Sequence, residues 1–227
     1  EQAGKAVDFI NSQYLSGQEA VDGFAADILE QAGEDLSGDA WTIDNLSLRD
    51  RIIGLADRLG NRNTLLTYII TTQNGDGTFG PYANEYGTKV PLQALAAVAG
   101  DTRGTEVHDQ VKQAINQAVS YFREGFLSGS LTYDSTGWSF DYRCVAALAA
   151  AGEDLSSTDW VYEDISLQER AVNSAREAAA DPQLHSPVEL AKELLVLIAV
   201  DPASPDIDVL ADGILAQRDV SVPGKFG

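Results

Sequence analysis

The chain has 227 residues and a formal net charge of −20, from 15 Lys and Arg against 35 Asp and Glu. This charge argues against a nucleic-acid or anionic-membrane partner, because phosphate groups would be repelled. Its single cysteine, Cys144, rules out an internal disulfide, and no apolar stretch reaches the roughly 20 residues that a membrane-spanning helix needs.

Two kinds of helix are predicted to alternate along the chain. Amphipathic helices, expected in an outer layer, are predicted over 2–13, 47–59, 62–73, 105–124, 166–179 and 205–217. Alanine-rich helices with few charges, expected in an inner layer, are predicted over 18–32, 88–99, 139–151 and 187–199. The inner layer is expected to contain Ala94, Leu95, Ala147, Leu148, Leu194 and Leu197. No strand of substantial length is predicted.

An internal duplication is visible at a fixed offset of 119 residues. The matched pairs are Gly33 and Gly152, Trp41 and Trp160, Leu48 and Leu167, and Arg51 and Arg170. Such matches in register indicate repeated supersecondary units. Weaker copies of the same helix end lie at Gly100 and Val200. Gly33, Gly100 and Gly152 are expected in the left-handed conformation that ends a helix. Ser47-x-x-Asp50 and Ser166-x-x-Glu169 are expected to form reciprocal capping boxes at the starts of the helices that follow them.

A stereotyped corner follows the helix predicted at 62–73. Its sequence, Gln73-x-x-Asp76-Gly77-x-Phe79, resembles the corner of the repeat in the α/α-toroid superfamily, which includes terpenoid cyclases, protein prenyltransferase β-subunits and transcobalamin-type carriers. The resemblance implies that Gln73 and Phe79 tie a helix end to the next turn and are structural residues. Gln217, together with residues 224–227, resembles the start of another copy of this corner motif.

The predicted fold is all-α: an α/α toroid, or an open arc of repeated helical hairpins. Four to five hairpins are counted, whereas closed toroids of the resembled superfamily use about six. Residues 1–227 are expected to form a single toroid-like domain, either complete as an arc or cut from a longer protein. In the second case Leu194, Leu195, Ile198 and Leu210 are expected to be covered by further repeats or by another copy of the chain.

The sequence assigns no catalytic residue and no cofactor. Asp206-Ile207-Asp208 lacks the third carboxylate of the cyclase acid motif. Asp141, Cys144 and His185 are residue types that bind zinc, but the prenyltransferase pattern separates its Asp and Cys by two positions rather than three. We therefore expect no metal site. The zinc alternative uses Asp141, Cys144 and His185. Otherwise Asp141 is expected to cap a helix or to pair with Arg143, and His185 to be a loop or cap residue.

Aromatic residues gather just before or at the starts of two inner helices, where the helix starts of a toroid converge on its cavity. These candidate ligand-binding residues are Phe79, Tyr82, Tyr86, Trp138, Phe140 and Tyr142. Aromatic faces suit an apolar, sugar or ring-containing ligand. The competing interpretation is that these rings pack the corners.

The function expected from these patterns is a non-catalytic module that binds a small ligand or a protein, in a secreted or surface-associated prokaryotic protein. A cytoplasmic location stays open. The alternative is an enzyme that resembles a prenyltransferase or terpenoid cyclase, or a polysaccharide lyase.

Overall fold

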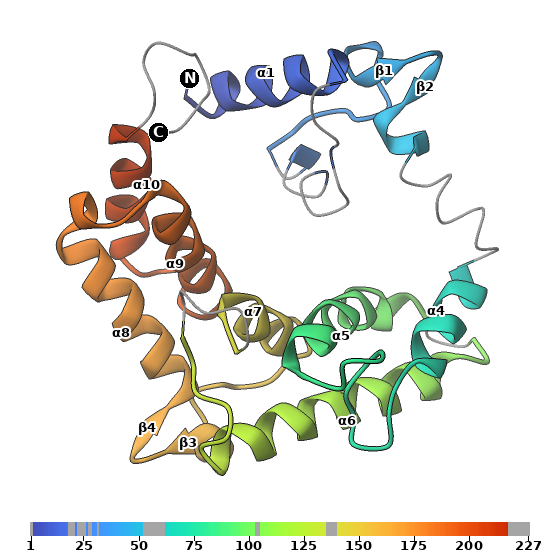
Figure 1. Cartoon of the computed structure of the whole chain (residues 1–227), viewed down its shortest axis with the longest axis vertical. Helices are drawn as coiled ribbons and strands as arrows, with labels where there is room; N and C mark the ends of the chain where they lie inside the picture. The colour runs from blue at the N-terminus through green and yellow to red at the C-terminus, as the bar shows by residue number, and fades with distance from the viewer. Residues whose placement is uncertain are drawn as a thin grey trace. The chain divides into compact units, whose positions relative to one another are not determined.

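A computed structural model describes residues 2–17, 21, 26, 29–30, 32–51, 62–102, 105–134 and 140–217. These residues are mostly helical, which confirms the all-α class, and the strands among them are four segments of two residues each (Figure 1). Contacts divide the chain into two compact units, residues 1–65 with 217–227 and residues 66–216. The single domain over 1–227 stays a prediction.

The first unit begins with α1 (Gln2–Leu15) and continues with a 3-10 helix (Asp39–Trp41) and the hairpin of β1 (Thr42–Ile43) and β2 (Leu46–Ser47). Helical structure starts again at residues 48–51. Its described core residues are Tyr14, Ala26, Leu29, Leu36, Trp41 and Leu48. Most of the inner helix predicted at 18–32, and the continuation of the one predicted at 47–59, lie outside the described residues.

The second unit contains most of the described helices. They are the C-terminal part of α4 (Arg62–Thr71), α5 (Glu85–Ala99), α6 (His108–Leu127), α7 (Tyr142–Ala150), α8 (Leu167–Ala180), α9 (Pro187–Val200) and α10 (Asp206–Ala216). Three 3-10 helices (Gly100–Thr102, Thr158–Trp160 and Pro182–Leu184) and the hairpin of β3 (Val161–Tyr162) and β4 (Ile165–Ser166) connect them. For these helices and α1, the predicted ends lie within three residues of the observed ones.

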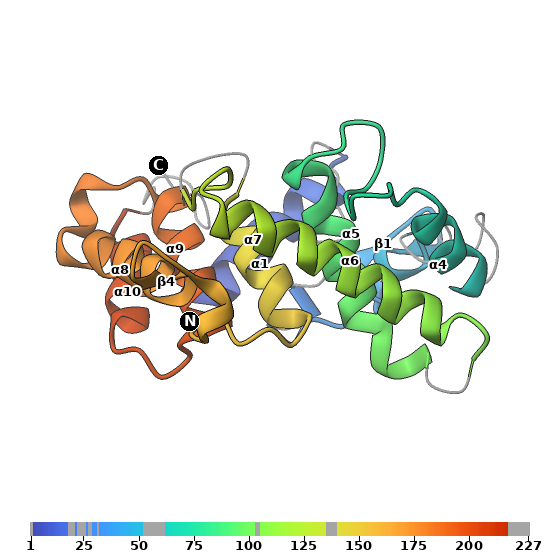
Figure 2. The same cartoon turned by 90° about the horizontal axis from the view of Figure 1, so that it is seen from below.

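Inside the second unit, α7 packs against both α5 and α9, so these three helices form a row. α6 packs on α5, while α8 and α10 pack on α9. In Figure 1, α6 lies beside α5 and α8 lies beside α9, and Figure 2 shows α6 crossing in front of α5. Three of the four helices predicted as inner, α5, α7 and α9, therefore contact one another in order along the chain.

Burial agrees with most of the predicted inner residues. Leu95, Ala147, Leu148 and Leu197 are fully buried, and Leu194 is half-buried beside the α8–α10 helices. Ala94 is exposed, which corrects its prediction: it precedes Leu95 and so points about 100° away from it around the helix.

The apolar residues near the C-terminal helices that were expected to lack cover are only partly exposed. Ile198 is about half exposed, but Leu210 is fully buried, because α10 turns it toward Leu190 and Leu197. Leu194 and Leu195 are half-buried. The apolar surface left at this end is therefore smaller than the sequence indicated.

Only half of each predicted capping box is observed: among the described residues the serine hydroxyl makes its bond, but the return bond from the serine backbone N–H to the carboxylate is absent. The hydroxyl of Ser47 accepts the backbone N–H of Asp50, and that of Ser166 accepts the N–H of Glu169. A complete reciprocal capping box, which was not predicted, starts α9 at Ser186. Each such bond satisfies an amide that has no partner inside its helix.

The helix-ending glycines behave differently from one another. Gly33 and Gly152 are left-handed, with φ of 93° and 86°, as predicted. Gly100 has a φ of −62°, because the chain continues from α5 directly into a 3-10 helix rather than turning away.

The duplicated sequences fold into the same local structure in both units. In the first, the Trp41 indole Nε1 donates to Glu34 Oε2 at 3.0 Å; in the second, Trp160 Nε1 donates to Glu153 Oε2 at 3.0 Å. Both tryptophans are buried. An indole N–H needs a partner when buried, so each glutamate satisfies a donor that would otherwise destabilise the core.

The hairpins of the two copies match in their turns and in the bond that follows. An Arg51 guanidinium N–H donates to the Ile43 carbonyl and an Arg170 N–H donates to the Tyr162 carbonyl, both at 2.5 Å. The two turn residues of each hairpin have positive φ between 53° and 63°: Asp44, Asn45, Glu163 and Asp164. Two consecutive residues with positive φ suit the tight turn of a two-residue hairpin.

The duplication also extends backward, at a different offset. Leu15-Ser16-Gly17 recurs as Leu127-Ser128-Gly129, 112 residues later, and the glycines have φ of 70° and 72°. The preceding rings, Tyr14 and Phe126, pack on the tryptophan of their own unit with centroids 6.0 and 6.2 Å away. Helix α1 is thus the counterpart of the C-terminal half of α6. A gap-free comparison misses this match because the offset changes by seven residues.

We expect Trp160→Phe to lower the free energy of unfolding by about 2 kcal/mol, because it removes buried ring volume and the indole donor of Glu153. Urea unfolding followed by far-ultraviolet circular dichroism would measure this. Leu184→Ala, at an exposed side chain, is the control and should change little. In a double-mutant cycle with Glu153→Leu, which has no acceptor, the losses should fall short of the sum; fully additive losses would contradict the role of this hydrogen bond.

Candidate functional site

The corner between α4 and α5 is fastened to α6 by a single side chain. Gln73 Nε2 donates to the Gly77 carbonyl at 3.2 Å and to the Ala114 carbonyl of α6 at 2.8 Å. Phe79 is buried, and its backbone N–H donates to Thr88 Oγ1. These bonds confirm the structural role predicted for Gln73 and Phe79: they hold the turn against its neighbouring helices.

Gly77 brings the turn into direct contact with the backbone of α6. Its φ is 89°, and a Cβ at this position would lie 2.2 Å from the Gln117 carbonyl oxygen. Only glycine fits both the left-handed conformation and this approach. Asp76 stabilises the same turn, because its Oδ1 accepts from the backbone N–H and the hydroxyl of Thr78.

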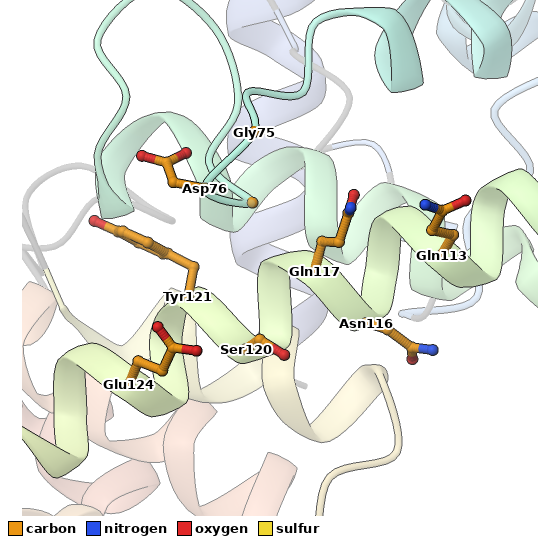
Figure 3. Close-up of a pocket in the computed structure, with 9 residues that line it drawn as sticks. Gly75, Asp76, Gln113, Asn116, Gln117, Ser120, Tyr121 and Glu124 are labelled. Carbon is orange, nitrogen blue, oxygen red and sulfur yellow. The ribbon is translucent and has the colours of Figure 1, made fainter.

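A groove with a volume of about 520 Å³ lies between this turn and one face of α6 (Figure 3). Its lining residues are Gly75, Asp76, Gly77, Gln113, Asn116, Gln117, Ser120, Tyr121 and Glu124. The α6 residues are spaced by three and four positions, so they form one stripe along the helix. Asp76 and Tyr121 lie at the same end of the groove in Figure 3.

The polar side chains in the middle of the stripe are available to a ligand. Within the described part of the chain, no hydrogen bond engages the side-chain amides of Gln113, Asn116 and Gln117. Each amide offers two N–H donors and one carbonyl acceptor. The groove therefore presents a row of uncommitted donors and acceptors.

Two of the ionisable groups that line the groove, Tyr121 and Asp76, have shifted pKa values. Burial, followed by the charge of Glu85, raises the pKa of Tyr121 to about 12, and its hydroxyl donates to Glu85 Oε2 at 3.3 Å. The two hydrogen bonds from Thr78 lower the pKa of Asp76. At neutral pH the groove thus contains a neutral phenol and a charged carboxylate.

The duplicated helix α1 shows which residues of α6 the fold itself requires. Residues 6 and 7 of α1, Ala-Val, match Ala118-Val119 of α6 at the 112-residue offset. The groove positions do not match. With the residue 112 positions earlier given first, the pairs are Glu1 and Gln113, Gly4 and Asn116, Lys5 and Gln117, Asp8 and Ser120, Phe9 and Tyr121, and Ser12 and Glu124. The amide stripe is therefore a property of α6 that the shared packing does not explain.

The aromatic residues predicted to bind a ligand lie in different environments. Phe79 and Phe140 are 1% exposed and belong to the hydrophobic core, which leaves no ring face open to a ligand. Tyr142 is also almost buried, whereas Tyr82 and Tyr86 are 77% and 49% exposed. A ligand-binding role for the exposed pair stays a prediction. Trp138 lies outside the described residues.

The three residues of the zinc alternative have other roles in the structure. Asp141 caps α7 by accepting the N–H groups of Arg143 and Cys144, which confirms its predicted capping role, and its Oδ2 accepts from Lys89 Nζ at 2.7 Å. Cys144 is fully buried, and burial raises the pKa of its thiol to about 12. His185 follows the 3-10 helix at 182–184. Within the described residues, no group of three or more His, Cys, Asp or Glu could hold a metal ion.

A scan against protein-family models found no match, and searches of curated proteins and of solved structures found none either. Among the described residues, no helix is long and apolar enough to cross a membrane.

Substituting Gly77 should disrupt the corner, and Gly75 provides a matched control in the same turn. We expect Gly77→Ala to cost at least about 2 kcal/mol, because it combines left-handed backbone strain with a backbone clash. Gly75→Ala should change stability by less than about 0.5 kcal/mol, since a Cβ there meets nothing within 4 Å. Urea unfolding curves of both variants test this; equal stabilities would show that α6 does not confine the turn.

Removing the cation of the buried ion pair should also destabilise the second unit. We expect Lys89→Met to cost about 3–5 kcal/mol, because it leaves the Asp141 carboxylate buried without this partner. Lys192→Met, at a half-exposed side chain, is the control. Adding Asp141→Asn to the Lys89→Met variant should recover part of the loss, and thermal unfolding by circular dichroism measures all three. No recovery would show that the buried charge is not the cause.

Proposed function

We propose that the chain is a non-catalytic ligand-binding module of a secreted or surface-associated prokaryotic protein, and that its ligand lies in the groove between the 75–77 turn and α6. One observation carries this proposal. The amides of Gln113, Asn116 and Gln117 form a stripe whose side chains have no hydrogen-bond partner in the described part of the chain. The counterpart helix α1 lacks these residues.

The construction of the groove supports binding. Its floor is α6, and its wall is a turn that Gln73 and Gly77 hold at a fixed distance from that helix. A groove of this kind is already formed before a ligand arrives, so binding would order few additional residues. Preformed sites with a few directed polar groups are typical of small-ligand recognition.

The chemistry of Tyr121 favours binding over catalysis. A pKa of about 12 makes its phenolate too scarce near neutral pH to act as an efficient general base. A polysaccharide lyase that used Tyr121 as its base is therefore disfavoured, and the lyase alternative would need Asp76 or Glu124 of the groove to remove the proton.

We also propose that the helical hairpins form an open arc of the α/α-toroid type. The row of α5, α7 and α9, with α6 and α8 packed along it, supports alternating layers. The bond from Gln73 to the turn supports the resemblance in the corner sequence. A toroid-like arrangement would also suit the alternative in which the module binds another protein.

The proposal is tested by following backbone amide resonances of the protein during titration with a collection of small sugars, amides and amino acids. We expect some of these compounds to shift the resonances of the α6 stripe and the 75–77 turn. Gln117→Arg should abolish these shifts by filling the groove with a long cationic side chain. Gln110→Arg is the matched control, because Gln110 is exposed on the same helix but does not line the groove.

Shifts that persist in Gln117→Arg, or that fall only outside the groove, would overturn the assignment of the site. An absence of any shift at the groove across the collection would overturn the binding function proposed for it.

A further inference from the structure

We infer that the groove on α6 binds a neutral, hydroxyl-rich chain, namely an oligosaccharide without acidic groups. The inference rests on the proposed function, since it names the ligand of the same site. It follows from the donors and acceptors of the groove, from its charge and from its length.

The hydrogen-bonding groups match the requirements of sugar hydroxyls. A hydroxyl group both donates and accepts, and neighbouring hydroxyls on a sugar ring present both functions side by side. The amides of Gln113, Asn116 and Gln117, together with the Ser120 hydroxyl, offer both functions at successive positions along the groove. An apolar ligand would leave these groups unsatisfied, which costs free energy.

Tyr121 provides the apolar part of the site. Its side chain is half-exposed, and its hydroxyl is already bonded to Glu85. That bond fixes the orientation of the ring and leaves its face, rather than its hydroxyl, to the ligand. A flat aromatic face complements the C–H face of a pyranose ring.

The charge of the groove excludes acidic ligands. Asp76 and Glu124 line it, and among the described lining residues none is Lys or Arg. The lowered pKa of Asp76 keeps this carboxylate charged at neutral pH. Uronates, sulfates and phosphates would be repelled, whereas a carboxylate is a strong acceptor for the hydroxyls of a neutral sugar.

The length of the stripe favours a chain over a single sugar. Gln113 and Glu124 are eleven positions apart, which corresponds to about 16 Å along α6. This exceeds one sugar ring, and the groove is open rather than enclosed (Figure 3). A linear ligand can therefore contact the amides and Tyr121 at the same time.

A basic peptide is the main competitor, because the chain carries a net charge of −20. Ion pairs with solvent-exposed carboxylates contribute little, about 0–1 kcal/mol, and Asp76 is exposed. The amides occupy the middle of the groove and offer nothing specific to a cation. A neutral sugar can form hydrogen bonds with more of the groove's side chains than a basic peptide can.

Isothermal titration calorimetry with short neutral oligosaccharides of glucose, mannose and xylose tests the inference, with oligogalacturonate and oligolysine as charged comparisons. We expect at least one neutral series to bind, with affinity that rises with chain length and does not change with added sodium chloride. Asn116→Ala and Tyr121→Ala should each weaken this binding at least tenfold. Gln110→Arg should leave it unchanged.

Failure of the inference is distinguishable from failure of the proposed function. If only oligolysine or oligogalacturonate binds, and Gln117→Arg alters that binding, the groove is a site but its ligand is not a neutral sugar. If no neutral oligosaccharide binds at its solubility limit, the inference is overturned. If a neutral oligosaccharide binds equally to wild type, Asn116→Ala and Gln117→Arg, its site lies elsewhere and the proposed groove is wrong.

Discussion

The position of α6 depends on the carboxylate of Glu153. It accepts the indole N–H of the buried Trp160 and pairs with the guanidinium of Arg123 on α6, which also lies over the Trp160 ring. Toward its other end, α6 accepts a hydrogen bond from Gln73 at Ala114. These two contacts lie nine residues apart on α6, and the hydrogen bond from Tyr121 to Glu85 adds a third between them, so the stripe that lines the groove runs along a fixed segment.

The internal duplication separates what the fold requires from what the site requires. The bond between tryptophan and glutamate, the two-residue hairpin and the helix-ending Leu-Ser-Gly occur in both copies, so packing and chain geometry explain them. The exposed faces of α1 and α6 differ in sequence at nearly every groove position. Exposed residues contribute little to stability, so a fold constraint does not account for the amides on α6, which is why the proposed function rests on them.

Much of the fold could be predicted because its signals are local. Periodicity and helix-ending residues placed the described helices, and the repeated Gly-Glu-Asp-Leu-Ser sequence revealed the module around Trp160. The ion pair between Lys89 and Asp141 joins residues 52 positions apart, and no local sequence pattern predicts that these two residues pair. The groove escaped prediction for a similar reason: Gln113 and Asn116 are ordinary on the polar face of a helix until the 75–77 turn is placed beside them.

The same reasoning explains why two of the aromatic candidates, Phe79 and Phe140, lie in the core. Phe140 stacks on Phe122 with centroids 5.7 Å apart, and Lys89 pairs with Asp141 where the starts of α5 and α7 meet. In the interior, aromatic rings pack on other rings and the buried cation pairs with the buried carboxylate. Large apolar side chains near helix junctions are usually buried in this way. Residues that remain chemically uncommitted are more informative, and in the second unit the amides of α6 are such residues. In the second unit α5 and α7 thus form the packed support, and α6 carries the surface on which the proposed ligand would lie.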